Sequence, residues 1–221
     1  MTRLVIWDFD GTLVDSRPQI EAGLDHTLGL LGLGPEVREA WLACVGLPVQ
    51  DAIERTFVPL GLTYAEVYPV YRSFDWPGSE GLIRPFAGMP ELLAELHAAG
   101  VRMAIASSKR GEPLRRQAAR FAWQPYFDPI ITPDEVGTAT KPHPESLWQA
   151  LRAHDLAPGD AVMVGDTPFD LEMARRAGVP GIGVAHGFYG SADLEAWGPV
   201  GCARDAEGLR ELLLSRLGRA I

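Results

Sequence analysis

The chain has 221 residues, enough to bury a substantial core, and its 47% hydrophobic and 22% charged residues are those of an ordinary soluble globular protein. Its 20 Lys and Arg residues against 29 Asp and Glu residues give a formal net charge of -9, which argues against a broad nucleic-acid-binding surface. A small anionic substrate is compatible with this charge, because a few cations and a metal ion can control the field inside a pocket.

The cysteines and the hydropathy pattern indicate where the protein works. Cys44 and Cys202 are far apart and do not have the spacing of a metal site, which fits a reducing compartment. No apolar run approaches the roughly 20 residues of a membrane span, and no basic-then-apolar leader precedes the first expected strand. We therefore expect a cytoplasmic protein with neither a nucleic acid nor a membrane as its partner.

The first expected element is a strand over residues 4–7, which is followed directly by Asp8. Four apolar residues before an acid are typical of a strand that is buried on both faces and carries a carboxylate at its C-terminal end. Asp10-Gly11 is a tight-turn signal that places a second carboxylate just beyond the strand. One acid could act as nucleophile and magnesium ligand while the other moves a proton, although Asp-x-Asp alone is equally typical of a solvated turn.

The next part of the chain, residues 16–82, is expected to be helical throughout. A helix is predicted over 17–33, where apolar residues recur every three to four positions and glycines end the run. Three further helices are predicted over 35–45, 48–60 and 63–74. Because this block interrupts an alternating strand and helix pattern, we interpret it as an inserted domain, with joints at 14–17 and 78–88.

Strands and helices alternate through the remaining chain. Strands are expected over 101–106, 129–132, 161–164 and 181–185. Helices are expected over 90–99, 114–123, 145–154, 171–177 and 206–217. This alternation favours a Rossmann-like, doubly wound parallel sheet with helices on both faces, an α/β core built from residues 1–15 and 83–221.

Two more polar positions are candidates for phosphate binding. Ser107, with Ser108 beside it, follows the strand over 101–106, where a hydroxyl can donate to a phosphate oxygen or simply cap a helix. Lys141 is one of only two lysines and stands in Lys141-Pro142-His143-Pro144, whose prolines stiffen the segment. Its compact ammonium suits a point contact with a phosphoryl oxygen and a carboxylate, the alternative being a solvated loop lysine.

A second pair of acids follows the strand over 161–164. Asp166 stands at the end of that strand, and Asp170 lies four residues later on the first turn of the next helix. Magnesium prefers oxygen ligands and keeps several waters, so one carboxylate from each of two strands plus a backbone carbonyl would hold it. We expect Asp166 to be a ligand and Asp170 to lie behind the ligands, unless it is only a helix N-terminal acid.

Taken in order, the four motifs resemble those of the haloacid dehalogenase superfamily across nearly the whole chain. DFDGT at 8–12, Ser107, Lys141 and GDTPFD at 165–170 are similar to its first to fourth motifs, and residues 16–82 resemble its helical cap of the first type. GLPVQDAI at 46–53, PFAGMPELL at 85–93 and HGFYG at 186–190 are most similar to phosphoglycolate phosphatases and their near relatives.

This resemblance implies a mechanism and a cofactor. Asp8 would attack the phosphorus of a small phosphorylated metabolite to form an aspartyl-phosphate, while Asp10 protonates the leaving alcohol and then activates water. Mg²⁺ would be held by Asp8, the Asp10 backbone carbonyl and Asp166, with Asp170 behind them. The phosphoryl oxygens would be bound by the amides around Gly11, by Ser107, Ser108 and Lys141, with Thr12 steadying the turn.

Two other functions are compatible with the same motifs. A phosphosugar mutase of the β-phosphoglucomutase type would share them and protect the aspartyl-phosphate from water. A non-catalytic binding or regulatory module would tolerate loss of Asp10 or Lys141, both of which this chain retains. Asp10 also argues against a dehalogenase, and the absence of lysine from 16–82 argues against a phosphonoacetaldehyde hydrolase. The cap cations that could meet a second substrate anion are Arg38, Arg55 and Arg72, although a solvated surface position is the default for arginine.

Overall fold

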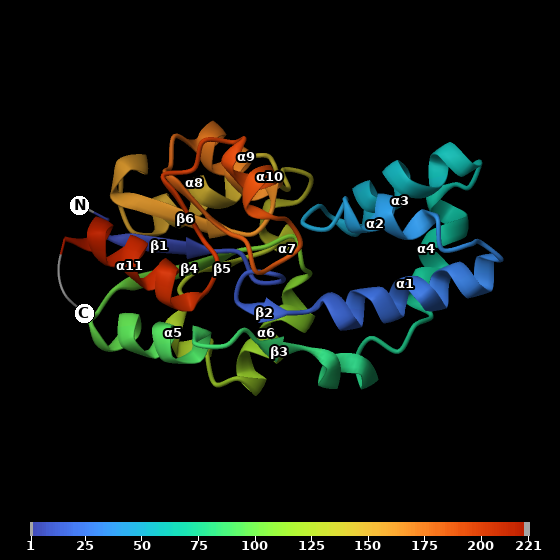
Figure 1. Ribbon diagram of the computed structural model, residues 1–221, viewed down its shortest axis with the longest axis horizontal. Coiled ribbons are helices and arrows are strands. Elements are labelled where there is room, and N and C mark those ends of the chain that lie inside the picture. The colour runs from blue at the N-terminus through green and yellow to red at the C-terminus, as the bar shows by residue number, and fades with distance from the viewer. Residues whose placement is uncertain (1, 219–221) are drawn as a thin grey trace.

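A six-stranded parallel sheet forms the centre of the computed structural model, which describes residues 2–218 (Figure 1). Its strands are β1 (Leu4–Trp7), β4 (Arg102–Ala106), β5 (Ile130–Ile131), β6 (Ala161–Gly165), β7 (Gly181–Val184) and β8 (Gly201–Ala203). Their spatial order is β5-β4-β1-β6-β7-β8, so β1 lies inside the sheet with a neighbour on each side. The predicted doubly wound α/β fold is therefore confirmed.

Helices cover both faces of this sheet. They are α5 (Met89–Ala98), α6 (Gly111–Arg120), α7 (Pro133–Val136), α8 (Glu145–Ala153), α9 (Pro168–Ala177), α10 (Ser191–Glu195) and α11 (Ala206–Leu217). Val5 and Trp7 of β1 belong to a hydrophobic cluster with α5 and α11, whereas Leu4 and Ile6 belong to a second cluster with α8 and α9. The alternation of a strand thus sends successive side chains into two separate layers. Among residues 2–218, no helix combines the length and the apolar character that crossing a bilayer would need.

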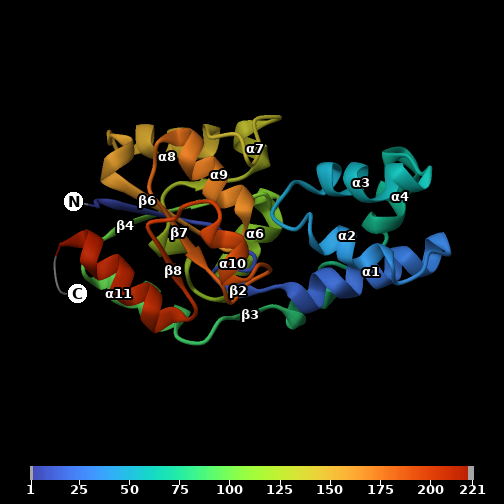
Figure 2. The same ribbon diagram turned by 45° about the horizontal axis from the view of Figure 1, so that its top comes forward.

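The helical block has a hydrophobic core of its own. Its main helices are α1 (Arg17–Leu31), α2 (Val37–Leu42), α3 (Val49–Phe57) and α4 (Tyr64–Arg72). Leu24, Ile53, Phe57 and Val67 are buried within this block, apart from the two clusters of the sheet. Both views show the block beyond the end of the sheet toward which β1 points (Figures 1 and 2). We accordingly propose residues 16–82 as a cap placed over the carboxyl ends of the strands.

The two passages between cap and core run side by side. Strand β2 (Val14–Asp15) pairs antiparallel with β3 (Arg84–Pro85), with Val14 opposite Pro85. The sequence marked these segments only as joints, because two-residue strands about 70 positions apart leave no periodic pattern. Their pairing binds the entry and the exit of the cap together.

Several predicted element boundaries are wrong. The helix expected over 114–123 starts at Gly111 and ends at Arg120, and the chain then folds Trp123 into the core. The helix expected over 48–60 ends at Phe57, after which Val58–Leu60 forms a 3-10 turn that contains a proline. Helices α7 and α10 and strand β8 were not predicted, since each is too short to show a hydrophobic period.

We expect Ile6→Ala to lower the free energy of unfolding by about 2–5 kcal/mol, because Ile6 is fully buried between β1 and the helices α8 and α9. Leu30→Ala is the matched control: Leu30 is 63% exposed, and its truncation should change stability by less than about 0.5 kcal/mol. Urea denaturation of both variants measures the difference. Equal losses would contradict the central placement of β1.

Candidate active site

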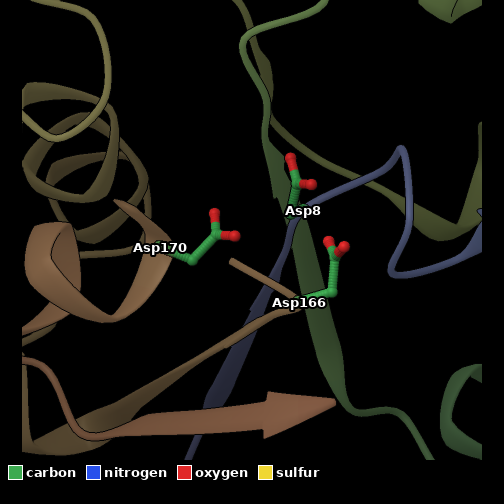
Figure 3. Close-up of side chains that lie close together, drawn as sticks. All are labelled: Asp8, Asp166 and Asp170. Atoms are coloured by element: carbon green, nitrogen blue, oxygen red, sulfur yellow. The ribbon is translucent and has the colours of Figure 1, made fainter. Parts of the chain in front are cut away.

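Three buried aspartates meet at the carboxyl ends of two neighbouring strands. Because β1 and β6 pair in parallel with Trp7 opposite Val164, Asp8 and Asp166 leave the sheet at the same edge. Asp170 reaches the same point from the first turn of α9. One oxygen from each of the three carboxylates lies within 4.8 Å of the other two, and Figure 3 shows the three side chains gathered around one space. The structure thus brings Asp8 and Asp166 together, as their strand-end positions predicted.

Lys141 is the cation of this cluster. Its Nζ lies 2.5 Å from Asp8 Oδ1 and 2.6 Å from Asp170 Oδ1, and its side chain is buried. Burial by itself would lower the pKa of the ammonium, but the charges of Asp170 and Asp8 outweigh it and raise the pKa. The lysine therefore stays protonated, and the alternative of a solvated loop lysine is wrong.

The cluster carries more negative charge than Lys141 compensates. Burial, together with the charge of Asp170, raises the pKa of Asp8 to about 7, although Lys141 acts in the opposite direction. Burial and the charges of Asp8 and Asp170 also raise the pKa of Asp166 well above its ordinary range. Three buried carboxylates face a single ammonium group, so a further cation would balance the remaining negative charge. All the available ligand atoms are oxygens, which suits Mg²⁺. These residues could therefore hold the predicted metal.

The Asp10-Gly11-Thr12 turn folds directly against Asp166. Thr12 Oγ1 donates to Asp166 Oδ1 at 2.9 Å, and the Phe188 backbone N–H donates to Oδ2 at 2.8 Å. Gly11 has φ +84°, and a Cβ there would lie 2.2 Å from Asp166 Oδ2, so only glycine fits this close approach. Phe188 was quoted from the sequence only as part of HGFYG, and its role in orienting Asp166 was not predicted.

Both oxygens of Asp170 are already in use. Oδ1 accepts from Lys141, and Oδ2 accepts from the backbone N–H of Thr167 at 3.1 Å and from its Oγ1 at 2.7 Å. Thr167 and Asp170 form a capping box at the start of α9. Asp170 is therefore a helix N-terminal acid, and it also lies beside the expected metal ligands. Asp170 thus fixes Lys141 in position. Among residues 2–218, Asp166 accepts one hydrogen bond at each oxygen and Asp8 accepts one only from Lys141, so Asp8 Oδ2 is the freest oxygen of the three carboxylates.

Asp10 lies outside the carboxylate cluster and pairs with Lys109. The Lys109 Nζ is 2.9 Å from Asp10 Oδ1 and 3.1 Å from Oδ2. Lys109 is the other of the two lysines in the chain, and no role was predicted for it from the sequence. Its place directly after Ser107-Ser108, at the end of β4, was the signal that could have identified it.

The two serines differ in what they contact. Helix α6 begins at Gly111 with Arg110 in the capping position, so Ser107 is not its cap and lies buried at the end of β4. Ser108 Oγ donates to the Gly46 carbonyl at 2.7 Å and so connects the core to the cap. Gly46 has φ +104°, and a Cβ there would lie 2.8 Å from Thr167 Cγ2. The cap thus touches the core at the second and fourth motifs.

A cavity of about 520 Å³ separates cap and core, and Asp8, Asp10 and Ser107 line it together with Lys109. Of the three cap arginines considered for a second anion, Arg72 lines the cavity. Arg38 instead pairs with Asp25, and Arg55 lies over the Phe169 ring.

Comparison with known proteins agrees with this geometry. A family model described as haloacid dehalogenase-like hydrolase matches residues 5–184. Pyrophosphatase PpaX from Halalkalibacterium halodurans is 27% identical, over 95% of each chain. Probable phosphatase IndB from Dickeya dadantii is 33% identical, over 90% of this chain and 88% of its own. The crystal structure of a predicted phosphoglycolate phosphatase from Haemophilus somnus has the same fold, with a TM-score of 0.81, 20% identity and coverage of 96% and 98% of the two chains.

We expect magnesium to stabilise the protein more at about pH 8 than at about pH 6. The pKa values of Asp8 and Asp166 are higher in the folded chain than in the unfolded one, so without metal both groups destabilise the fold as pH rises, Asp8 as pH rises through about 7. A metal binds the deprotonated carboxylates, so its affinity falls about tenfold for each pH unit below that value. Thermal unfolding with and without magnesium at both pH values measures the effect.

Asp166→Asn is the control for this measurement. The substitution removes one negative charge and one carboxylate ligand for the metal, so magnesium should no longer raise the unfolding temperature. Without metal, the variant should be more stable than the wild type at about pH 8. A magnesium shift of equal size at both pH values would show that the cluster is not the binding site.

Proposed function

Since this chain belongs to the haloacid dehalogenase-like hydrolases, we propose that it is a magnesium-dependent phosphatase that hydrolyses a small phosphate monoester through a phosphorylated Asp8. The observation that carries this proposal is the buried Asp8 carboxylate, held by Lys141 beside Asp166 and open to the cavity. Phosphoglycolate is the reference substrate, because the sequence resembles phosphoglycolate phosphatases and a protein named as one shares the fold. Pyrophosphate is included because PpaX is a pyrophosphatase.

Asp8 has the properties that a nucleophile needs. Its Oδ1 is held by Lys141, while Oδ2 has no hydrogen-bond partner among residues 2–218 and is the oxygen free to attack. Lys141 stabilises the ionised form of Asp8. Held in place by Asp170, it would also contact an oxygen of the transferring phosphoryl group. The bond from Asp8 to phosphorus would form as the leaving alcohol departs.

Asp8, Asp166 and the backbone carbonyl of Asp10 would hold the metal. When bound, Mg²⁺ would offset the repulsion between the Asp8 carboxylate and the phosphoryl oxygens. Thr12 and the Phe188 amide hold Asp166 in the orientation that this role requires.

Asp10 is suited to moving the proton. It lines the cavity beyond Asp8, so it can donate to the leaving oxygen and then take a proton from the attacking water. Lys109 fixes its carboxylate through both oxygens. The remaining phosphoryl oxygens would be bound by the Thr12 amide, by Ser107 and by Lys141. The Gly11 N–H and the Ser108 hydroxyl, which were also expected to bind phosphate, instead donate to the carbonyls of Val14 and Gly46.

We expect Asp8→Asn to lower the rate of phosphate release at least about a thousandfold, because the amide cannot form the acyl-phosphate bond. Asp155→Asn is a matched control: it lies at the end of α8, away from the cavity, and its φ of +52° is one that asparagine tolerates. Inorganic phosphate is measured with phosphoglycolate, pyrophosphate, sugar phosphates and nucleotides, with magnesium and with a chelator. Full activity of Asp8→Asn would exclude the proposed nucleophile, and isomerisation without phosphate release would identify a mutase instead.

We expect Gly46→Ala to lower kcat/KM at least about tenfold, since its Cβ would push the cap away from Thr167 and displace groups that must meet across the cavity. Gly61→Ala is the control, because Gly61 also has a positive φ, +82°, but nothing lies within 4 Å of the added Cβ. It should lose some stability and keep its kcat/KM. If Gly46→Ala and Gly61→Ala lowered kcat/KM equally, backbone strain, rather than the contact between cap and core, would explain the loss of activity.

A further inference from the structure

The cavity is far larger than the catalytic groups require. Its 520 Å³ lies within the range of about 300–1,000 Å³ that is common for sites enclosing drug-sized ligands. Asp8 and Asp10 occupy one part of its wall, and the cap and the segment leading back to the core supply most of the remainder. The leaving group of a phosphate monoester would extend into this second part.

Aromatic rings from the cap dominate that part of the wall. Trp41, Tyr71 and Trp76 all line the cavity, and the Tyr71 ring contacts the other two, with ring centroids 5.6 Å apart for Trp41 and Tyr71 and 4.7 Å apart for Tyr71 and Trp76. Burial, with a further contribution from the charge of Asp10, raises the pKa of the Tyr71 phenol, so this ring stays neutral. Such a wall favours a flat partner that stacks on it.

Trp76 is held rigidly in this wall. Its Nε1 donates to the Tyr71 carbonyl at 3.1 Å, and its ring packs on Phe74 at 4.9 Å. The indole also packs closely against Gly23 of α1, where an added Cβ would be 2.4 Å from it. A side chain fixed at three points loses little freedom when a ligand stacks on it, which favours binding.

The cavity offers little to a second anionic group. Lys109 is paired with Asp10, and Arg116 is paired with Glu80 and Glu112. The other described cations of the wall, Arg72 and Arg110, are exposed to solvent. A second carboxylate or phosphate would therefore have to displace an existing ion pair or bind in water, where it gains little.

Gln117 supplies a polar group without a protein partner. It lines the cavity from α6 and is 1% exposed, and its Oε1 has no hydrogen-bond partner in the described chain. Leaving a buried amide unsatisfied is costly, so such groups are usually completed by water or a ligand. A ring with a hydrogen-bonding edge would satisfy it.

From these observations we propose that the cavity binds phosphate monoesters whose leaving alcohol carries a flat heteroaromatic ring, which stacks on the Tyr71 and Trp76 wall and bonds to Gln117. The proposal rests on the proposed phosphatase function and names the substrate class of the same site. It predicts that the enzyme prefers such esters to compounds that carry a second anionic group in place of the ring, such as phosphoglycolate and pyrophosphate.

The test compares substrates that share the reacting bond. AMP and UMP carry a base on the same phosphorylated primary alcohol as ribose 5-phosphate, so the ring is the main difference between them. With the full-length protein and magnesium, we expect kcat/KM for at least one nucleotide to exceed that for ribose 5-phosphate by about tenfold or more, the size expected of a stacked base. It should also exceed the values for phosphoglycolate and pyrophosphate.

Variants separate ring binding from folding. Trp76→Leu should lower kcat/KM for the preferred nucleotide about tenfold and leave ribose 5-phosphate within about twofold. Trp148→Leu makes the same change at an exposed tryptophan of α8 outside the cavity and should alter neither value. Gln117→Met keeps the shape of the side chain, which belongs to α6 and lies outside the cap. This variant should also lower kcat/KM for the nucleotide and leave kcat/KM for ribose 5-phosphate unchanged. The test therefore remains valid even if the Trp76→Leu protein does not fold.

Binding distinguishes the two proposals from each other. Calorimetry on the Asp8→Asn protein should show AMP or UMP binding about tenfold more tightly than ribose 5-phosphate. If none of the compounds releases phosphate but this difference is present, the phosphatase proposal fails and the ring site stands. If phosphate is released but neither nucleotide exceeds ribose 5-phosphate, or phosphoglycolate or pyrophosphate is preferred, the ring site is overturned.

Discussion

The buried excess of negative charge at the end of the sheet is the constraint on which the rest of the site depends. One oxygen from each of Asp8, Asp166 and Asp170 lies within 4.8 Å of the other two, and Lys141 contacts Asp8 and Asp170 directly. Without a further cation, burial and the charge of the neighbouring Asp170 disfavour ionisation of Asp8 and raise its pKa, although Lys141 opposes them. Such a cluster costs stability, and proteins retain arrangements of this kind where they bind metals or perform chemistry.

The fold supplies the rigidity that this arrangement needs. Strand β1 is buried between two hydrophobic layers, and its parallel pairing with β6 determines where Asp8 and Asp166 leave the sheet. Hydrogen bonds from Thr12 and from the Phe188 amide then orient Asp166, while Thr167 orients Asp170. Each carboxylate is therefore positioned by groups that are themselves held by backbone packing.

The cap determines what the site can accept. It meets the core where Gly46 accepts a hydrogen bond from Ser108 and packs against Thr167, so the contact involves two of the four motifs themselves. Between these contacts and the paired strands β2 and β3, cap and core enclose a cavity with carboxylates at one part of its wall and aromatic rings at another. The same core chemistry can thus be offered to different leaving groups by changing the cap wall.

The sequence by itself was sufficient for the α/β class, the inserted helical block and the strand-end positions of Asp8, Ser107 and Asp166, because apolar runs that end in polar residues are local signals. Lys141 follows no such run and was recognised by its rarity and by the prolines beside it. The short strands β2, β3 and β8, the Lys109 contact with Asp10 and the Phe188 amide on Asp166 were decided only in the tertiary structure. Each of them joins residues distant in sequence or depends on elements of two to three residues, which show no period. The aromatic wall belongs to the same class: helical spacing alone does not tell which side of a ring faces a core and which faces a cavity.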